Sequence, residues 1–139
     1  MENSVDKVIQ LEIFTPYGEY LKEEVPSIDI VSCGTSFGLL PNHYPIISTL
    51  QVSVLYLTIE NEKKIYAIGD GVIRFENNVA TMLVECIERS DEIDLNRANE
   101  KVEEIKEKLK NENDKNLILA LQKSLRKAEN RIKVYNLGK

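Results

Sequence analysis

The chain has 139 residues, of which 42% are hydrophobic and 29% charged, and its formal net charge is −5. These values suit one globular domain, or a domain with an appendage. No run approaches the roughly 20 apolar residues of a membrane span, and an acidic whole argues against nucleic acid, because phosphate contacts need a broad basic face.

The first residues, "MENSVDKVIQ", lack a basic start followed by an apolar stretch, so we expect no secretory signal and an intracellular protein. The two cysteines, Cys33 and Cys86, lie far apart in the sequence and have no metal-type spacing. We expect both to be reduced and mostly buried, because thiols inside the cell usually remain reduced.

Residues 1–88 have the patterns of β-strands. We expect strands over residues 9–13, 25–32, 50–59, 65–76 and 79–88, where apolar residues alternate with polar ones or form short apolar runs. Turn residues separate them: Pro16 with Gly18, a polar stretch at 60–64, and the pair Asn77 and Asn78, which tolerates positive φ. Residues 33–45 are expected to form a loop. Many short strands with regular turns predict a sandwich or a barrel.

The rest of the chain is predicted to form two helices, because glycine is absent from 72 to 137 and proline is absent after Pro45. Each helix carries a narrow apolar seam with spacings of three and four residues. The seams are Ala98, Val102, Ile105 and Leu109, then Ile118, Leu121, Leu125, Ala128, Ile132 and Tyr135. A polar break at 111–116 makes the helices antiparallel neighbours.

Polar residues at the helix starts are candidate caps. Ser90 or Asp91 is expected to cap the first helix, and Asn113 or Asp114 the second. Two isolated helices with narrow seams are marginal in water, so the hairpin must dock on the β domain or on another subunit. If both docks are of similar strength, the hairpin moves between them.

Charge is unevenly distributed along the chain. Residues 1–90 carry 13 acidic and 6 basic side chains, whereas residues 115–139 carry seven basic side chains and one acid, Glu129. The basic last segment suits an acidic protein surface, and it equally suits a solvated helix face. Composition leaves both interpretations open.

No catalytic motif is recognisable. His43 is the only histidine, no second one completes a catalytic triad, and no His, Cys and acid cluster has metal spacing. The sequence "GDG" at 69–71 lacks the lysine and hydroxyl residue of a Walker loop and is interpreted as a strand turn. Pro41 and Pro45 stiffen the loop around His43, which suits an interface loop or a plain structural loop.

Three stretches together resemble the epsilon subunit of bacterial F-type ATP synthases. "GTSFGLLPNHYPIISTL" resembles that family's G-x-x-G-x-L-P-x-H-x-P segment, and "YAIGDGVIRFENNVATMLVECIERSDEIDLNRA" resembles its next blocks, including the I-D-x-x-R-A helix start. "LRKAENRIKV" is similar to its last helix. The order and spacing match across nearly all of the chain.

The resemblance implies an N-terminal ten-stranded β sandwich over 1–88 and a C-terminal antiparallel two-helix hairpin over 89–139. It implies a central-stalk rotor subunit, not an enzyme by itself, that couples ion-driven rotation of the c-ring to the catalytic head. The implied partners are the gamma subunit, the c-ring and the alpha and beta subunits, and the implied location is peripheral, at the cytoplasmic face of the bacterial inner membrane. The implied gamma and c-ring interface is Gly38, Leu40, Pro41, His43 and Pro45.

The hairpin of this family folds against the sandwich or extends along gamma, where it hinders ATP hydrolysis. The basic residues that the resemblance assigns to contacts with the catalytic head are Lys123, Arg126, Lys127, Arg131 and Lys133. The alternative interpretation is a free nucleotide-sensing module, a sandwich with a helical lid. A sandwich enzyme would need an acid or metal site that the sequence does not show.

Some members of the family bind one ATP at the folded hairpin, as a regulatory ligand and not a required cofactor. The matching residues here are Glu88, Asp94, Arg97, Ala98, Lys127 and Arg131. Glu104 departs from the pattern, because ATP-binding members carry an arginine there and an acid opposes a polyphosphate. A structural interpretation also explains the motif, since Asp94 favours the helix dipole, Arg97 can pair with it, and Ala98 allows close packing.

Overall fold

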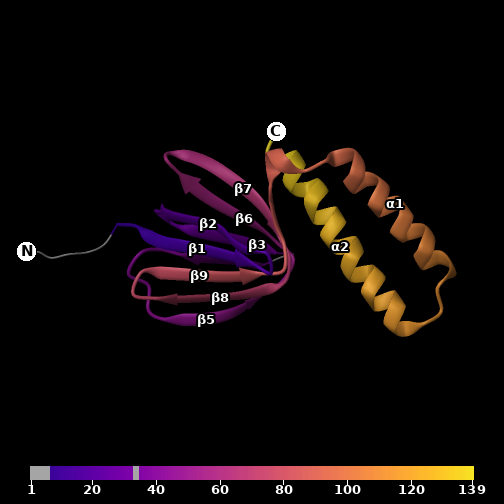
Figure 1. The fold of residues 1–139 in the computed structure, drawn as a ribbon, viewed down its shortest axis with the longest axis horizontal. Helices are drawn as coiled ribbons and strands as arrows, with labels where there is room; N and C mark the ends of the chain where they lie inside the picture. Colours follow the sequence, from indigo (N-terminus) through magenta and orange to yellow (C-terminus); the bar gives the residue numbers. More distant parts are fainter. Residues whose placement is uncertain (1–6, 33–34) are drawn as a thin grey trace, which may run out of the picture.

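The computed structural model describes residues 7–32 and 35–139. Within them, ten strands form two five-stranded sheets, and two helices follow (Figure 1). The strands are β1 (Ile9–Thr15), β2 (Gly18–Val25), β3 (Ile28–Ser32), β4 (Thr35–Leu39), β5 (Ile46–Leu50), β6 (Ser53–Ile59), β7 (Glu62–Ile68), β8 (Gly71–Glu76), β9 (Val79–Val84) and β10 (Ile87–Arg89). A short 3-10 helix, η1 (Ser90–Glu92), leads to α1 (Leu95–Asn111) and α2 (Lys115–Leu137). The predicted sandwich with a helical hairpin is confirmed.

The two sheets enclose one aliphatic core. The first sheet has the order β2-β1-β9-β8-β5, in which β1 and β9 run parallel, and the second has the order β10-β7-β6-β3-β4. Alternation along β1 buries Ile9, Leu11 and Ile13 between the sheets, as the period of two predicts. Phe75 and Tyr66 are the largest side chains in this core.

Three segments outside the predicted strands form strands, and the third is residues 46–49 of β5. Residues 18–25 form β2, an edge strand bonded only to β1, so most of its side chains are exposed and no apolar alternation marks it. Residues 35–39 form β4 inside the predicted loop 33–45, because they pair with β3 from Leu39 to Thr35. Residues 33 and 34 lie outside the described part of the chain.

Three predicted strands are each divided between the sheets. Only Leu50 of the stretch 50–59 lies in β5 of the first sheet, and β6 of the second sheet follows after residues 51–52. The stretch 65–76 divides at Gly69 and Asp70 between β7 of the second sheet and β8 of the first. The stretch 79–88 breaks at Glu85 and Cys86, which separates β9 from β10 in the same way. The apolar pattern resumes after each corner, because the residues on both sides of it pack into the same core. The sequence pattern therefore does not mark these corners.

The turns use the residues expected of them. Asn77 and Asn78 have φ of 53° and 62° between β8 and β9, so the predicted tight hairpin is confirmed. Gly71 begins β8 so close to β9 that a Cβ there would lie 2.0 Å from the Leu83 carbonyl oxygen. The "GDG" stretch is therefore a strand turn, as predicted, with Asp70 between the two strands.

Different residues from those expected cap the first helix. Ser90 and Asp91 belong to η1, and Asp94 is the N-cap of α1, where its carboxylate accepts a hydrogen bond of 3.1 Å from the Arg97 backbone. Arg97 thus contacts Asp94 through its backbone amide. Asp114 caps α2 by accepting from the amides of Asn116 and Leu117, as predicted.

The hairpin lies against the second sheet, and α2 lies between the sandwich and α1 (Figure 1). Ala98, Val102 and Ile105 of α1 and Ala128 of α2 are buried, so the predicted seams meet each other. Val134, which belongs to neither seam, is completely buried in a small cluster with Val54, Ile65, Ala67 and Ile93. No helix of the described residues is long and apolar enough to cross a membrane.

Candidate functional site

Three ion pairs connect α2 to carboxylates of the sandwich. Lys123, Lys127 and Arg131 are spaced four residues apart, which places them on one face of the helix, one turn after another. Lys123 Nζ lies 2.9 Å from Asp70 Oδ2, Lys127 Nζ 2.6 Å from Glu85 Oε1, and Arg131 Nε 2.7 Å from Glu88 Oε1. We call these six side chains the ion-pair ladder.

The three carboxylates of the ladder lie in strand connections or in the short last strand, at one end of the sandwich. Asp70 follows β7, Glu85 follows β9, and Glu88 lies in β10. Lys123 also lies 3.9 Å from Glu85, so the first two pairs share a carboxylate. The hydrogen bond to Asp70 raises the pKa of Lys123, which keeps its ammonium charged. The exposed fractions of these side chains fall between 27% and 43%, so solvent screens the pairs in part.

Beyond the ladder, α2 contacts the sandwich through one hydrogen bond and one apolar cluster. The Asn130 side chain donates to the Ser53 carbonyl oxygen at 2.8 Å, and Val134 fills the cluster toward the end of the helix. Lys123, Lys127, Asn130 and Val134 thus form a second helical stripe, spaced 4, 3 and 4. The apolar periodicity of the sequence does not reveal this stripe, because it is mostly polar.

The structure brings together three of the six residues predicted to bind a nucleotide. Glu88, Lys127 and Arg131 line one cavity of about 180 Å³ beside Cys86 and Asn130. Their charges are already matched, because Arg131 pairs with Glu88 and Lys127 with Glu85. For a phosphate to bind there, the two cations would have to exchange a carboxylate for it.

The other three predicted nucleotide residues do not line that cavity. Asp94 caps α1, Arg97 is exposed, and Ala98 is completely buried in the hairpin seam. The cavity is also smaller than the ~300–1,000 Å³ of most small-molecule sites. Glu104 is exposed and pairs with Lys108 at 3.0 Å, which lowers the pKa of Glu104. Nucleotide binding therefore stays a prediction.

A larger cavity of about 560 Å³ adjoins the first and shares Val52 and Asn130 with it. Arg126 and Lys133 line it, and both are exposed. Of the five basic residues predicted to contact the catalytic head, these two are accessible in the docked hairpin. The remaining three belong to the ion-pair ladder.

The loop predicted as an interface presents a fixed, partly apolar surface. Leu40 and Tyr44 are 66% and 73% exposed, and Gly38 and Pro45 are exposed as well. His43 is half-buried and stacks on Tyr44 with ring centroids 4.3 Å apart. Pro41 is also half-buried. Asn42, with φ of 71°, receives a hydrogen bond from Asn78 and donates its amide to the same side chain, so the loop is tied to the β8–β9 turn.

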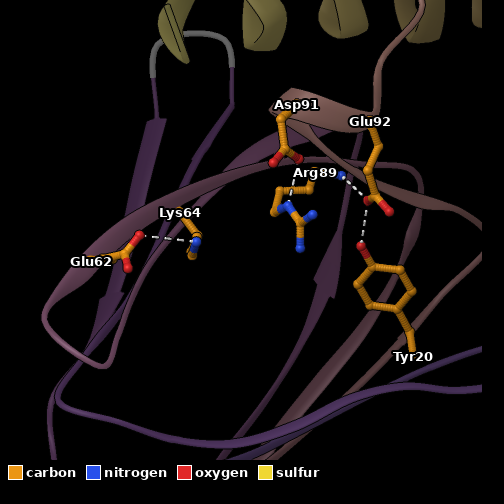
Figure 2. Close-up of polar contacts among 6 residues, drawn as sticks. All are labelled: Tyr20, Glu62, Lys64, Arg89, Asp91 and Glu92. Atoms are coloured by element: carbon orange, nitrogen blue, oxygen red, sulfur yellow. Dashed lines mark hydrogen bonds and ion pairs between the residues drawn. The ribbon is translucent and has the colours of Figure 1, made fainter.

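A second cluster holds the junction between sandwich and hairpin (Figure 2). Tyr20 of β2 donates a hydrogen bond of 3.0 Å to Glu92 Oε1, which also accepts from the Arg89 amide at 3.0 Å. The Arg89 guanidinium pairs with Asp91 in turn. Burial, reinforced by the bond to Glu92, raises the pKa of Tyr20. No sequence pattern singled out Tyr20, because it lies in β2, which was not predicted as a strand.

The cysteines show no catalytic arrangement. Cys86 is exposed and free, so the expectation of a mostly buried thiol is wrong for this residue. It lies in the corner between β9 and β10. Cys33 lies outside the described residues. Among the residues that the structure describes, no group of three or more His, Cys, Asp or Glu side chains could hold a metal ion.

The comparisons with known proteins agree with this architecture. Residues 8–90 match the model of the ATP synthase Delta/Epsilon chain, β-sandwich domain. The ATP synthase epsilon chain of Levilactobacillus brevis is 34% identical over 131 residues, covering 91% of this chain and 94% of the relative. That of Mycoplasmopsis pulmonis is 30% identical over 129 residues, covering 91% and 92%. The chain therefore belongs to the ATP synthase epsilon-chain family.

Solved structures share the fold. A chain in the Euglena gracilis mitochondrial ATP synthase, solved as OSCP/F1/c-ring, is similar with a TM-score of 0.79 and 20% identity, covering 94% of this chain and 82% of that one. A chain of the Tetrahymena thermophila mitochondrial ATP synthase central stalk and c-ring has a TM-score of 0.55 and 14% identity, covering 98% of each chain. Family membership confirms the prediction of a non-catalytic subunit of an ATP synthase complex.

Proposed function

We propose that this chain is a rotor subunit of the central stalk, which couples ion-driven rotation of the c-ring to the catalytic head. Family membership carries the proposal. One solved structure with the same fold comes from a central stalk and c-ring assembly. The functional units are then the sandwich, 1–88, and the hairpin, 89–139. The subunit reaches the cytoplasmic face of the inner membrane peripherally, through the ring.

The sandwich supplies the docking surface for gamma and the c-ring. Leu40, Tyr44 and Ile47 are strongly exposed around β5, and Val72 and Leu83 are exposed on paired positions of β8 and β9. Exposed apolar side chains grouped on one sheet favour a protein interface. These residues extend the predicted interface of Gly38, Leu40, Pro41, His43 and Pro45.

The hairpin supplies inhibition when it extends toward the alpha and beta subunits. Its docking to the sandwich uses one helix, three partly exposed ion pairs and a small apolar cluster. Such an interface is weak enough to be reversible. Release would expose Lys123, Lys127 and Arg131 together with Arg126 and Lys133, a basic face suited to an acidic surface on the head.

Co-purification tests the rotor proposal against the alternative of a free nucleotide-sensing module. The tagged chain is expected to co-purify with gamma and the catalytic head, and Tyr44→Asp should weaken that association. Tyr17→Asp is the matched control, because Tyr17 is 98% exposed and lies outside the proposed interfaces. A chain that runs alone in every preparation would support the free module.

A further inference from the structure

We propose that the docked hairpin of this chain is held by its own carboxylates instead of a nucleotide, so that ionic strength, and not ATP, sets the docked fraction. The proposal concerns the conformation of the chain by itself and does not depend on the rotor assignment. It follows from the ion-pair partners of the basic side chains of α2.

Each cation of the ladder already has an anion. Glu85 Oε1 lies 2.6 Å from Lys127 Nζ, and Glu88 contacts Arg131 through Nε at 2.7 Å and through a hydrogen bond from Nη2 at 3.4 Å. These two cations are the ones that the family resemblance assigns to phosphate. The carboxylates of the sandwich thus take the place of a ligand's phosphates.

The ladder extends over about two turns of α2. From Lys123 to Arg131 it spans nine residues, a rise of about 12 Å along the helix, and it is supported by the bond from Asn130 to Ser53. Apolar contact lies at one end, around Val134. Over this length, the polar contacts between α2 and the sandwich are the three ion pairs and one hydrogen bond.

Partial exposure makes these pairs sensitive to salt. Interactions between exposed charges are screened strongly once the Debye length falls to roughly 3 Å near 1 M salt. Apolar contacts strengthen or stay constant under the same conditions. Added salt should therefore lower the docked fraction if ion pairs hold the hairpin, and should not lower it if apolar contacts do.

A spin-label distance measurement on the full chain tests this. Labels at Asn61→Cys, in the exposed β6–β7 turn, and Asn113→Cys, between the helices, report docking once Cys33 and Cys86 are replaced by serine. From about 20 mM to about 1 M NaCl, the long-distance population should grow several-fold, as expected for three screened ion pairs. At constant ionic strength, saturating ATP should leave the distribution unchanged.

Charge exchange identifies the pairs. Lys127→Glu should lower the docked-to-open ratio by about fivefold or more, since it replaces a pair with a repulsion. Adding Glu85→Lys should restore the ratio in part, because position 85 also faces Lys123. Lys106→Glu is the control, because it makes the same net-charge change at an exposed position on α1, the helix that packs on α2. A distance distribution that does not change with NaCl concentration, or docking that is seen only when ATP is present, would overturn the proposal.

Discussion

The Nε atom of Arg131 lies 2.7 Å from Oε1 of Glu88, so an ion pair joins the last helix to the last strand. The close contact is not aligned as a hydrogen bond, and the aligned bond runs from Nη2 to Oε2 at 3.4 Å. Both residues matched positions of a nucleotide site in the sequence. In the docked hairpin they are each other's partners, which changes what a mutation at either position should do.

Arg131→Ala tests the nucleotide prediction directly. Any ATP binding should weaken, by about tenfold, because a charge-assisted phosphate contact is lost. Isothermal titration of the full chain measures it. Lys133→Ala is the control, since Lys133 is exposed and does not line the smaller cavity. No saturable heat up to roughly millimolar ATP, a binding energy of about 4 kcal/mol, would end the idea of an ATP sensor.

Asp94→Ala should reveal the motif's structural role. Loss of the N-cap is expected to cost about 1 kcal/mol of unfolding free energy, because the Arg97 amide loses its acceptor. Urea denaturation measures the change. Asn96→Ala, an exposed substitution in the first turn of α1, should stay within about 0.5 kcal/mol. Equal losses in the two variants would contradict the assignment of the cap.

Gly71→Ala should destabilise the sandwich. The added Cβ would lie 2.0 Å from the Leu83 carbonyl oxygen, and backbone atoms cannot yield as a flexible side chain does. The expected loss is about 1–3 kcal/mol, typical of overpacking, and thermal denaturation measures it. Gly38→Ala is a milder comparison, because its Cβ would meet the Asp29 carboxylate at 3.2 Å and backbone only at 4.0 Å. A Tm shift no larger than that of Gly38→Ala would be inconsistent with the close approach.

Tyr20→Phe should loosen the junction and change the alkaline stability. The lost hydrogen bond to Glu92 is expected to cost about 1 kcal/mol. The folded-state pKa of Tyr20 is raised, so its stabilising effect is complete below the unfolded pKa near 10 and decreases as the pH rises above that value. Urea midpoints measured from roughly pH 8 to pH 11 should fall less steeply in Tyr20→Phe than in the parent chain. Parallel curves would refute the role of this phenol.

Local sequence patterns predicted most strands and turns, but not the points at which the chain crosses from one sheet to the other. Period-two alternation identified β1, and the asparagine pair identified the β8–β9 turn, because both signals lie within a few residues. The edge strand β2 and the corners at 51–52 and 85–86 depend on which sheet a segment joins, and a local pattern does not carry that information. The N-cap of α1 is Asp94 and not the predicted Ser90 or Asp91, because those two residues belong to η1.

The candidate site shows the same division. The resemblance singled out Glu88, Lys127 and Arg131, and the structure brings these three together. It did not pair Lys123 with Asp70 or Lys127 with Glu85, because these contacts cross from the helix to strand ends about 40 to 50 residues earlier. Charge spacing along α2 was the available signal, and it was read only as a basic face.

The most direct test of the central claim is ATP hydrolysis by the assembled complex after deletion of residues 91–139. The deletion removes both helices and leaves the sandwich, whose ten strands end at Arg89 within the described part of the chain. We expect hydrolysis to rise while gamma and the c-ring remain associated. Unchanged hydrolysis in an intact complex would contradict an inhibitory hairpin.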